Sequence, residues 1–130
     1  MQTYVDGDVE ALLACLADAW VIHDVDGSTS SRSDMGEVTR LHAEGFPEKS
    51  VAYLHEVVEG GHVAHHVRFT LVHSGRYYDL EPTGREIELE EMIFHRMEDA
   101  LIGESWRMIF PEGAYAALAK RDVPLRAGNE

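Results

Sequence analysis

Three side chains in this sequence are of types that move protons or hold negative charge in enzymes: Asp24, His95 and Arg107. A carboxylate kept from water at the mouth of an apolar pocket has a raised pKa and can act as a general base. A histidine titrates near neutral pH, and an arginine offers a rigid fork of donors to a carboxylate, carbonyl or enolate oxygen. We therefore treat them as candidate catalytic groups. Each has a structural alternative: a solvated turn for Asp24, a hydrogen-bonded core histidine for His95, and an ion pair or surface position for Arg107.

Long predicted strands must position two of these candidates. Residues 63–73 are rich in Val, Phe, Thr and His and contain neither Gly nor Pro, as a long strand requires. Residues 86–98 and 101–110 form a second pair of strands around a tight turn, and residues 50–59 form a strand before them. Together they predict a curved antiparallel sheet, with a ligand bound in the hollow of the curve.

The turn between the last two strands decides which side chains face each other. Side chains alternate along a strand, so Ser105 and Arg107 share one face. A three-residue turn would place His95 opposite Ser105 and Ile93 opposite Arg107. A two-residue turn would shift the pairing by one residue and exchange the faces.

The segment before the sheet predicts two helices and a brief strand. Asp8 can cap a helix whose apolar residues follow the 3.6-residue period, and residues 20–23 form a short strand. A second helix begins at Asp34 and ends before Pro47. The turn-rich residues 24–33 between them are expected to form a mobile loop, of which residues 28–33 cover the pocket entrance.

The order of elements predicts an α+β protein with helices on one face of the sheet. We expect residues 1–120 to form a single domain, with a short last helix at 112–120, and residues 121–130 to form a polar tail. A hydrophobic content of 45% fits a globular protein rather than a disordered one.

The charge of the chain argues against two classes of partner. The formal net charge is −13, with 24 acidic against 11 basic residues, which disfavours binding to nucleic acid or to a membrane surface. The single Cys15 rules out a disulfide framework, and its place in a helical apolar pattern predicts a buried thiol. No apolar run approaches the roughly 20 residues of a membrane span, and no signal peptide precedes the first helix. We expect a cytoplasmic protein.

The adjacent histidines at positions 65 and 66 do not predict a metal site. Neighbouring residues on a strand point to opposite faces, so only one of His65 and His66 can enter the pocket. His73 shares a face with His65 but lies eight residues further on, about 26 Å along one strand. We expect no metal ion.

Several short motifs occur together in one order along the chain. They are Gly7-Asp8, Trp20-Val-Ile-His-Asp24, Phe46-Pro47, His73-Ser-Gly75, Pro82-Thr-Gly-Arg85 and Ile102-Gly-Glu-Ser-Trp106. With these motifs the chain resembles the SnoaL-like polyketide (ester) cyclases of the nuclear-transport-factor-like superfamily, over nearly its whole length. This resemblance implies a cone-shaped α+β barrel, a pocket inside the cone for a small hydrophobic molecule, no metal or organic cofactor, and a homodimer formed across the sheet.

The resemblance also shows where this sequence departs from the family. In the aldol cyclases the residue after the tryptophan of the Glu-x-Trp motif is the acid that moves the proton, and here it is Arg107. The histidine usually found before that tryptophan is Ser105, so the usual cyclase mechanism cannot operate unchanged. Asp24 lies where the related ketosteroid isomerases have their proton-abstracting aspartate.

Other residues are expected to contact the ligand in the cone. Tyr4 aligns with a family tyrosine that shapes the pocket, and Ser105 points inward if the family alignment holds. The full set of expected substrate-binding residues is Tyr4, Trp20, Tyr53, His66, Phe69, Ile93 and Ser105. The acidic run at residues 86–91 is expected to be a solvated face or a sheet edge that discourages edge-to-edge association.

These observations favour a small biosynthetic enzyme that performs acid–base chemistry without a cofactor on a bulky carbonyl compound. The reaction would be a cyclisation, an isomerisation or an elimination, with Asp24 as the base and with Arg107 and His95 at the developing oxyanion. One alternative is a non-catalytic protein that binds a hydrophobic ligand or assists another enzyme. Another is an epoxide hydrolase, since related cones use Asp and Arg together, but this route needs a second inward carboxylate.

Overall fold

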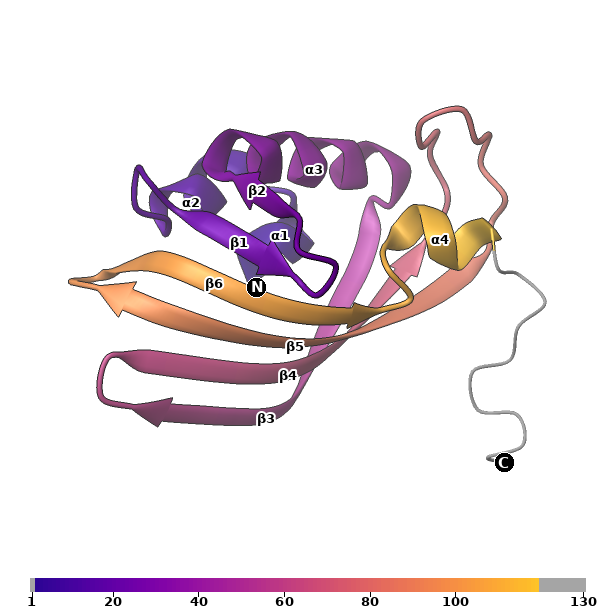
Figure 1. The fold of residues 1–130 in the computed structure, drawn as a ribbon. Coiled ribbons are helices and arrows are strands. Elements are labelled where there is room, and N and C mark those ends of the chain that lie inside the picture. The colour runs from indigo at the N-terminus through magenta and orange to yellow at the C-terminus, as the bar shows by residue number, and fades with distance from the viewer. Residues whose placement is uncertain (1, 120–130) are drawn as a thin grey trace.

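The computed structural model describes residues 2–119, without the side chain of residue 119 (Figure 1). The predicted polar tail and the end of the predicted domain lie outside this range. In chain order the elements are α1 (Gln2–Asp6), α2 (Val9–Ala14), β1 (Val21–Asp24), β2 (Thr29–Ser31), α3 (Arg32–Gly45), β3 (Glu48–Glu59), β4 (His62–Val72), β5 (Glu86–Glu98), β6 (Leu101–Phe110) and α4 (Ala114–Ala119).

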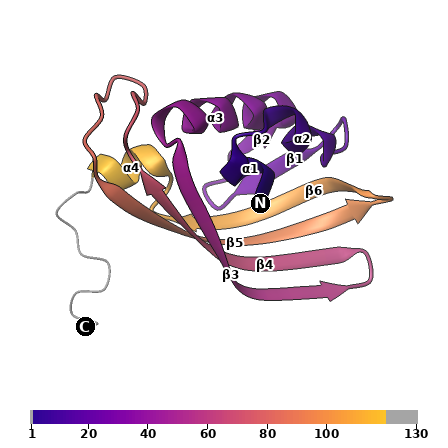
Figure 2. The same cartoon turned by 180° about the vertical axis from the view of Figure 1, so that it is seen from behind.

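The strands form one curved sheet in the order β2-β1-β6-β5-β4-β3. Helices α1, α2 and α3 all lie over the same face of this sheet, which we call the inner face (Figures 1 and 2). This confirms the α+β class and the wrapping of a sheet around N-terminal helices. The four strands predicted to form an antiparallel sheet, β3 to β6, do pair antiparallel. Strand β1 joins this sheet parallel to β6, so the whole sheet is mixed, and it is open rather than closed into a barrel.

The segment between β1 and α3 is more regular than its turn-rich composition suggested. Residues 29–31 pair with β1 as an edge strand, so the expected loop at 24–33 is a hairpin that runs directly into α3. Ser31 caps α3 in a capping box with Asp34, and the helix therefore begins at Arg32 rather than at Asp34. Asp8 caps α2 as predicted, with its Oδ1 accepting from the Ala11 amide at 3.1 Å.

The cysteine does not occupy the buried position that the helical pattern predicted. Helix α2 ends at Ala14, so Cys15 follows the last helical residue, and its side chain is exposed. The next residues of the apolar period, Leu16 and Ala17, are buried, and Cys15 lies outside this set of inward positions.

The β5–β6 hairpin has the predicted pairing for a different reason. His95 lies opposite Ser105 and Ile93 lies opposite Arg107, as the three-residue turn required. The turn itself has only two residues, since Glu98 pairs with Leu101, and the ladder regains its register through a bulge at Gly103. A two-residue turn plus one bulged residue shifts the pairing by the same amount as a three-residue turn.

The inner face carries two apolar clusters with polar side chains between them. One cluster lies around Phe46, Phe69 and Leu71 and includes α4, and the other contains Trp20 and Ile22. Charged residues of β1, β5 and β6 lie between these clusters on the same face, and they form the candidate site described next.

Candidate functional site

Arg107 lies between two carboxylates on the inner face. Its Nε donates to Asp24 Oδ1 at 2.8 Å, and its Nη1 lies 3.6 Å from Glu91 Oε2. The parallel β1–β6 ladder places Asp24 directly opposite Arg107, while Glu91 comes from the neighbouring strand β5. The side chains of Asp24 and Arg107 are 22% and 24% exposed, so solvent reaches this pair. The family resemblance implied an inward arginine, and an ion pair was one of the alternatives considered for it.

Glu91 is the residue of this group that the sequence analysis missed. It belongs to the acidic run that was expected to be solvated, yet its side chain is only 5% exposed. Its inward position could have been found from the alternation of side chains on β5, because Glu91 lies between the inward residues Leu89 and Ile93. Burial raises the pKa of Glu91, and the charge of Arg107 partly opposes this rise.

His95 is held by a buried hydrogen-bond chain. Its Nδ1 lies 2.6 Å from Ser105 Oγ, which accepts the Trp20 indole N–H at 3.0 Å. Burial lowers the pKa of His95 to about 4, so the ring is neutral at pH 7. Of the two alternatives for His95, these contacts favour a hydrogen-bonded core histidine over a catalytic proton donor. Ser105 faces inward, as the family alignment implied.

A second chain of polar groups joins α1, α3 and the loop after β4. The Tyr4 hydroxyl lies 2.5 Å from His42 Nδ1, and His42 Nε2 lies 3.1 Å from the Tyr77 hydroxyl. Burial lowers the pKa of His42 to about 4 and raises the pKa of Tyr77 to about 12. The sequence predicted Tyr4 as a pocket residue, but it gave no reason to single out His42, which the α3 pattern marks only as a buried position.

The structure decides which of the two adjacent histidines faces inward. His65 lies on the inner face against the exposed ring of Tyr53, with 5.4 Å between ring centroids. His66 points to the opposite, outer face, where its Nε2 lies 2.6 Å from Glu90 Oε2. His66 therefore lies on the outer face, and the expectation that it points into the pocket inside the cone is wrong. Phe69 belongs to one inner-face apolar cluster, and Trp20 and Ile93 to the other.

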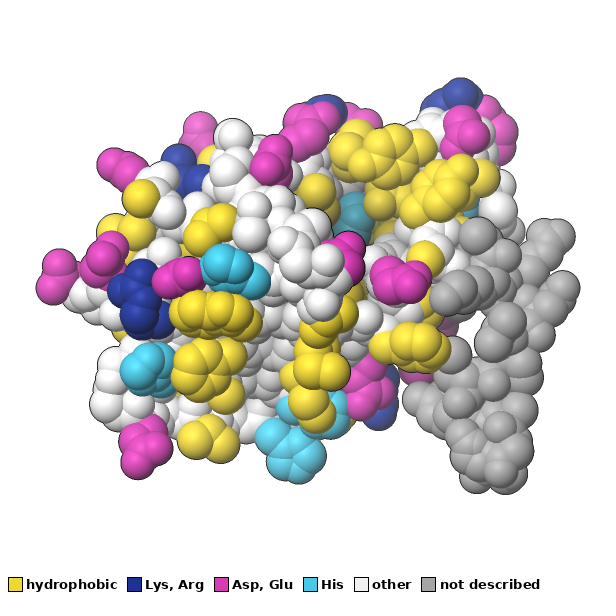
Figure 3. All heavy atoms as spheres, in the orientation of Figure 1, with side chains coloured by type: hydrophobic (Ala, Val, Ile, Leu, Met, Phe, Trp, Pro, Cys, Tyr) yellow, Lys and Arg dark blue, Asp and Glu magenta, His cyan; other side chains and the backbone are white. Residues whose placement is uncertain are grey.

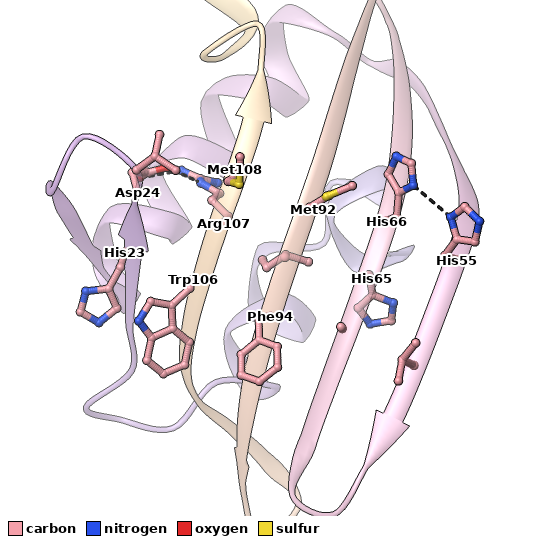
Figure 4. A pocket seen from close by; sticks show the side chains of 14 residues that line it. His23, Asp24, His55, His65, His66, Met92, Phe94, Trp106, Arg107 and Met108 are labelled. Carbon is pink, nitrogen blue, oxygen red and sulfur yellow. Dashed lines mark hydrogen bonds and ion pairs between the residues drawn. The ribbon is translucent and has the colours of Figure 1, made fainter.

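The outer face carries an open groove of 460 Å³ that crosses the strands (Figure 4). Trp106 and Phe94 lie side by side on β6 and β5 among the residues that line it, and Met108 and Met92 lie further along the same two strands. These four side chains are between 38% and 59% exposed. Hydrophobic side chains and histidines gather on this side of the molecule (Figure 3). We call this surface, defined by Met92, Phe94, Trp106 and Met108, the outer apolar face.

Within residues 2–119, no three or more His, Cys, Asp or Glu side chains come together in a way that could hold a metal ion. Across the same described segment, no helix is both long enough and apolar enough to span a membrane.

Comparisons with known proteins agree with this architecture. The family model described as SnoaL-like polyketide cyclase matches residues 1–111. AclR, a proposed hydroxylase from Streptomyces galilaeus, is 21% identical with a TM-score of 0.82, covering 98% of this chain and 82% of that chain. IdmH, a proposed polyketide cyclase from Streptomyces antibioticus, is 24% identical with a TM-score of 0.74, covering 94% and 92%. No curated protein matches the chain. At these identities the solved structures show a shared fold.

Proposed function

Because the chain belongs to the SnoaL-like polyketide cyclase family, we propose that it is an enzyme that moves a proton on a bulky, mostly apolar carbonyl compound. The substrate binds against the inner face of the sheet, beneath the helices. The reaction is a cyclisation, an isomerisation or an elimination that begins with removal of a proton next to the carbonyl, without a cofactor. The observation that carries this proposal is the position of Arg107 between Asp24 and Glu91.

The surroundings of the two carboxylates suggest different roles for them. Asp24 is held by two donors of Arg107, at 2.8 and 3.5 Å, so its oxygens are occupied as acceptors. Glu91 is more deeply buried and has a raised pKa, which makes its carboxylate the stronger base. We therefore assign proton removal to Glu91 rather than to Asp24, and we assign to Asp24 the positioning of Arg107.

The first chemical step follows from these roles. The proton on the carbon next to the carbonyl passes to a Glu91 carboxylate oxygen, and the electron pair of the broken C–H bond forms the enolate. The negative charge develops on the former carbonyl oxygen, where the Arg107 guanidinium stabilises it. The enolate then follows one of three courses. Its carbon attacks a second carbonyl to close a ring, its electron pair expels a leaving group from the adjacent carbon, or another carbon of the conjugated system takes the proton back from Glu91.

A second candidate function, epoxide hydrolysis, is favoured by one specific observation. This reaction needs two inward carboxyl groups, and Glu91 supplies the second beside Asp24. One ionised carboxylate would take a proton from water as the water oxygen attacks a ring carbon. A protonated carboxyl group would give its proton to the epoxide oxygen as the C–O bond breaks, and the product is a diol. A raised pKa suits Glu91 to the acid role here.

Simple probes distinguish the two candidates. Exchange of hydrogen for deuterium next to the carbonyl of a set of bulky cyclic ketones, followed by NMR in D₂O, reports proton removal. Formation of a diol from styrene oxide reports epoxide opening. We expect Glu91→Gln to slow ketone exchange by about 100-fold, as loss of a positioned base does.

Glu90→Gln is the matched control, because Glu90 is the neighbouring acid and points to the outer face. It should leave the ketone exchange rate unchanged. Ketone binding without exchange or diol formation would contradict both candidates and support the non-catalytic binding protein. Diol formation without ketone exchange would replace the first candidate with the second.

We propose that the partner of the outer apolar face is a second copy of this chain. The family resemblance implied a homodimer across the sheet, and Trp106, Phe94, Met92 and Met108 expose apolar surface on that side. Contiguous exposed apolar surface of this kind marks protein–protein contacts. A two-fold dimer would bring each copy of this face against the other.

A further inference from the structure

Two histidines and two methionines form a row across the outer face of the sheet. His55 on β3 pairs with His66 on β4, and His66 pairs with Met92 on β5. Met92 in turn pairs with Met108 on β6. Residues paired across neighbouring strands have their Cβ atoms about 5 Å apart, so each side chain of the row reaches the next. All four line the open groove of the outer face, where the Met92 side chain extends from β5 toward His66 (Figure 4).

A carboxylate fixes the position of the hydrogen on His66. Glu90 Oε2 lies 2.6 Å from His66 Nε2, and this hydrogen bond lowers the pKa of Glu90, so the carboxylate is ionised at pH 7. A carboxylate only accepts hydrogen bonds, so His66 Nε2 carries the hydrogen and the lone pair of the neutral ring is on Nδ1. Histidine ligands of metals usually donate their other ring N–H to a carboxylate in this way. Glu90 thus holds His66 in the tautomer of a metal ligand.

His55 supplies a second nitrogen at a distance that one metal ion can bridge. The Nδ1 atoms of His55 and His66 lie 3.0 Å apart, and a hydrogen bond joins them. Two nitrogens that each lie about 2.0 Å from one ion are about 3 Å apart when the two bonds meet at roughly a right angle. His55 is exposed, so its ring can turn toward an ion without repacking of the core. Its hydrogen then moves from Nδ1 to Nε2, and Nδ1 offers its lone pair.

The two methionines select the kind of ion. Thioether sulfur is a soft, neutral ligand that favours copper(I), whereas zinc sites use Cys, His, Asp or Glu. Met92 and Met108 are 55% and 59% exposed, so their side chains can turn toward an ion. Within residues 2–119 no three His, Cys, Asp or Glu side chains come together as metal ligands, so the row differs in kind from a zinc site. The net charge of −13 attracts cations to the surface.

We propose that His55, His66, Met92 and Met108 form a binding site for a soft monovalent metal ion, copper(I), on the outer face. Two imidazole nitrogens and two thioether sulfurs are neutral ligands, so the bound ion keeps one positive charge, which the Glu90 carboxylate offsets through His66. A self-association surface accounts for exposed methionines, but it does not account for an adjoining pair of histidines held by a carboxylate. The site is independent of the proposed chemistry, which lies on the inner face.

Silver(I) tests the site as a redox-stable ion with the same preference for sulfur. The ¹³C NMR signals of the methionine methyl groups report which sulfur atoms bind it. We expect one equivalent of silver(I) to shift the signals of Met92 and Met108 and to leave those of Met35 and Met97, which lie outside the row, unchanged. Shifts at Met35 or Met97 without shifts at Met92 and Met108 would overturn the proposal.

Competition with the chelator bathocuproine disulfonate, without oxygen, measures copper(I) binding itself. We expect one ion per chain, and we expect His66→Gln, Met92→Leu and Glu90→Gln each to weaken binding by about 10-fold or more, as loss of even an outer partner of a ligand does. His62→Gln and Met97→Leu are the matched controls. They lie four and five residues from the row along β4 and β5, about 13 and 17 Å, and should leave the affinity unchanged.

The row lies on the face that we propose for self-association, so binding is measured in wild type and in Trp106→Glu, which is expected to be a monomer. Binding in Trp106→Glu alone would support the site and place it inside the dimer contact. No binding in either protein would overturn the site. Binding that His66→Gln and Met92→Leu leave unchanged would show an adventitious ion only, and zinc binding as tight as copper(I) binding would contradict selection by the sulfur ligands.

Discussion

Glu91 and Arg107 meet diagonally across the β5–β6 ladder, with Oε2 and Nη1 3.6 Å apart, although the backbone of Arg107 pairs with Ile93. The contact joins the nearly buried carboxyl group of Glu91 to the same guanidinium group that bonds to Asp24. Any change at Arg107 therefore alters both carboxylates at once.

Replacing Arg107 with Met should destabilise the protein by about 1–3 kcal/mol, because it leaves a partly buried acceptor on Asp24 and removes the positive charge beside Glu91. The estimate is modest because Asp24 and Arg107 are partly solvated and Glu91 can take up a proton. Urea unfolding at pH 7 measures the change.

Arg68→Met is the matched control for this variant. Arg68 pairs with Glu90 on the outer face at 3.5 Å, with both side chains more than 30% exposed, so its loss should cost about 0–1 kcal/mol. An Arg107→Met variant as stable as Arg68→Met would show that the inner ion pairs contribute no more than surface pairs.

The protein should lose stability as the pH falls from about 6.5 toward 4. The folded-state pKa values of His42 and His95 are lowered to about 4 by burial, so below pH 6.5 the unfolded chain binds protons that the folded chain does not. Each histidine then costs about 1.4 kcal/mol of unfolding free energy per pH unit. Glu91 has the opposite effect, because its pKa is raised in the folded state. At pH values above the pKa of Glu91 in the unfolded chain, the folded chain binds more protons at this group, so Glu91 adds stability as the pH falls.

Comparison with His95→Gln isolates the contribution of one histidine. The amide of the variant can still bond to Ser105 but does not titrate, so the free energy of unfolding should fall less steeply between pH 6.5 and 4. Equal slopes in wild type and His95→Gln would show that the buried ring is protonated in the folded state.

Replacing Trp106 with Glu should prevent association through the outer apolar face. The side chain of Trp106 is 38% exposed and stacks on His23 with 5.3 Å between ring centroids. In a dimer formed through this face, the carboxylate of the introduced glutamate would be buried without a partner, which is strongly unfavourable. Sedimentation velocity should show a dimer for wild type and a monomer for Trp106→Glu. Tyr78→Glu, at an exposed position in the loop after β4, should remain dimeric.

Replacing Gly75 with Ala should strongly destabilise the protein or prevent folding. A Cβ atom there would lie 1.9 Å from the Glu44 carbonyl oxygen, and both groups belong to backbone that cannot move aside without disturbing the end of α3. Gly61→Ala is the control, because a Cβ at that position meets nothing within 4 Å. Thermal unfolding should separate the two variants, and equal melting temperatures would contradict the close approach of the loop to α3.

Some features of this protein follow from local sequence alone. The alternation of side chains on β6 predicted that Ser105 and Arg107 share one face, and the Asp8 cap and the long strands depend only on nearby residues. The short motifs in order indicated the family, which the match over residues 1–111 supports. Alternation along β5 also predicts that Glu91 points inward. Because its neighbours are acidic, the whole run was instead expected to be solvated.

Other features were decided only when distant segments came together. The parallel pairing of β1 with β6 brings Asp24 to Arg107 across 83 positions of sequence, and no local pattern specifies that neighbour. The Tyr4–His42–Tyr77 chain likewise needs a helix, a second helix and a loop to meet. Sequence period fixes the face on which a side chain lies, because that is a property of one strand or helix. The partner of that side chain, and hence its pKa and its chemistry, depends on how the elements pack.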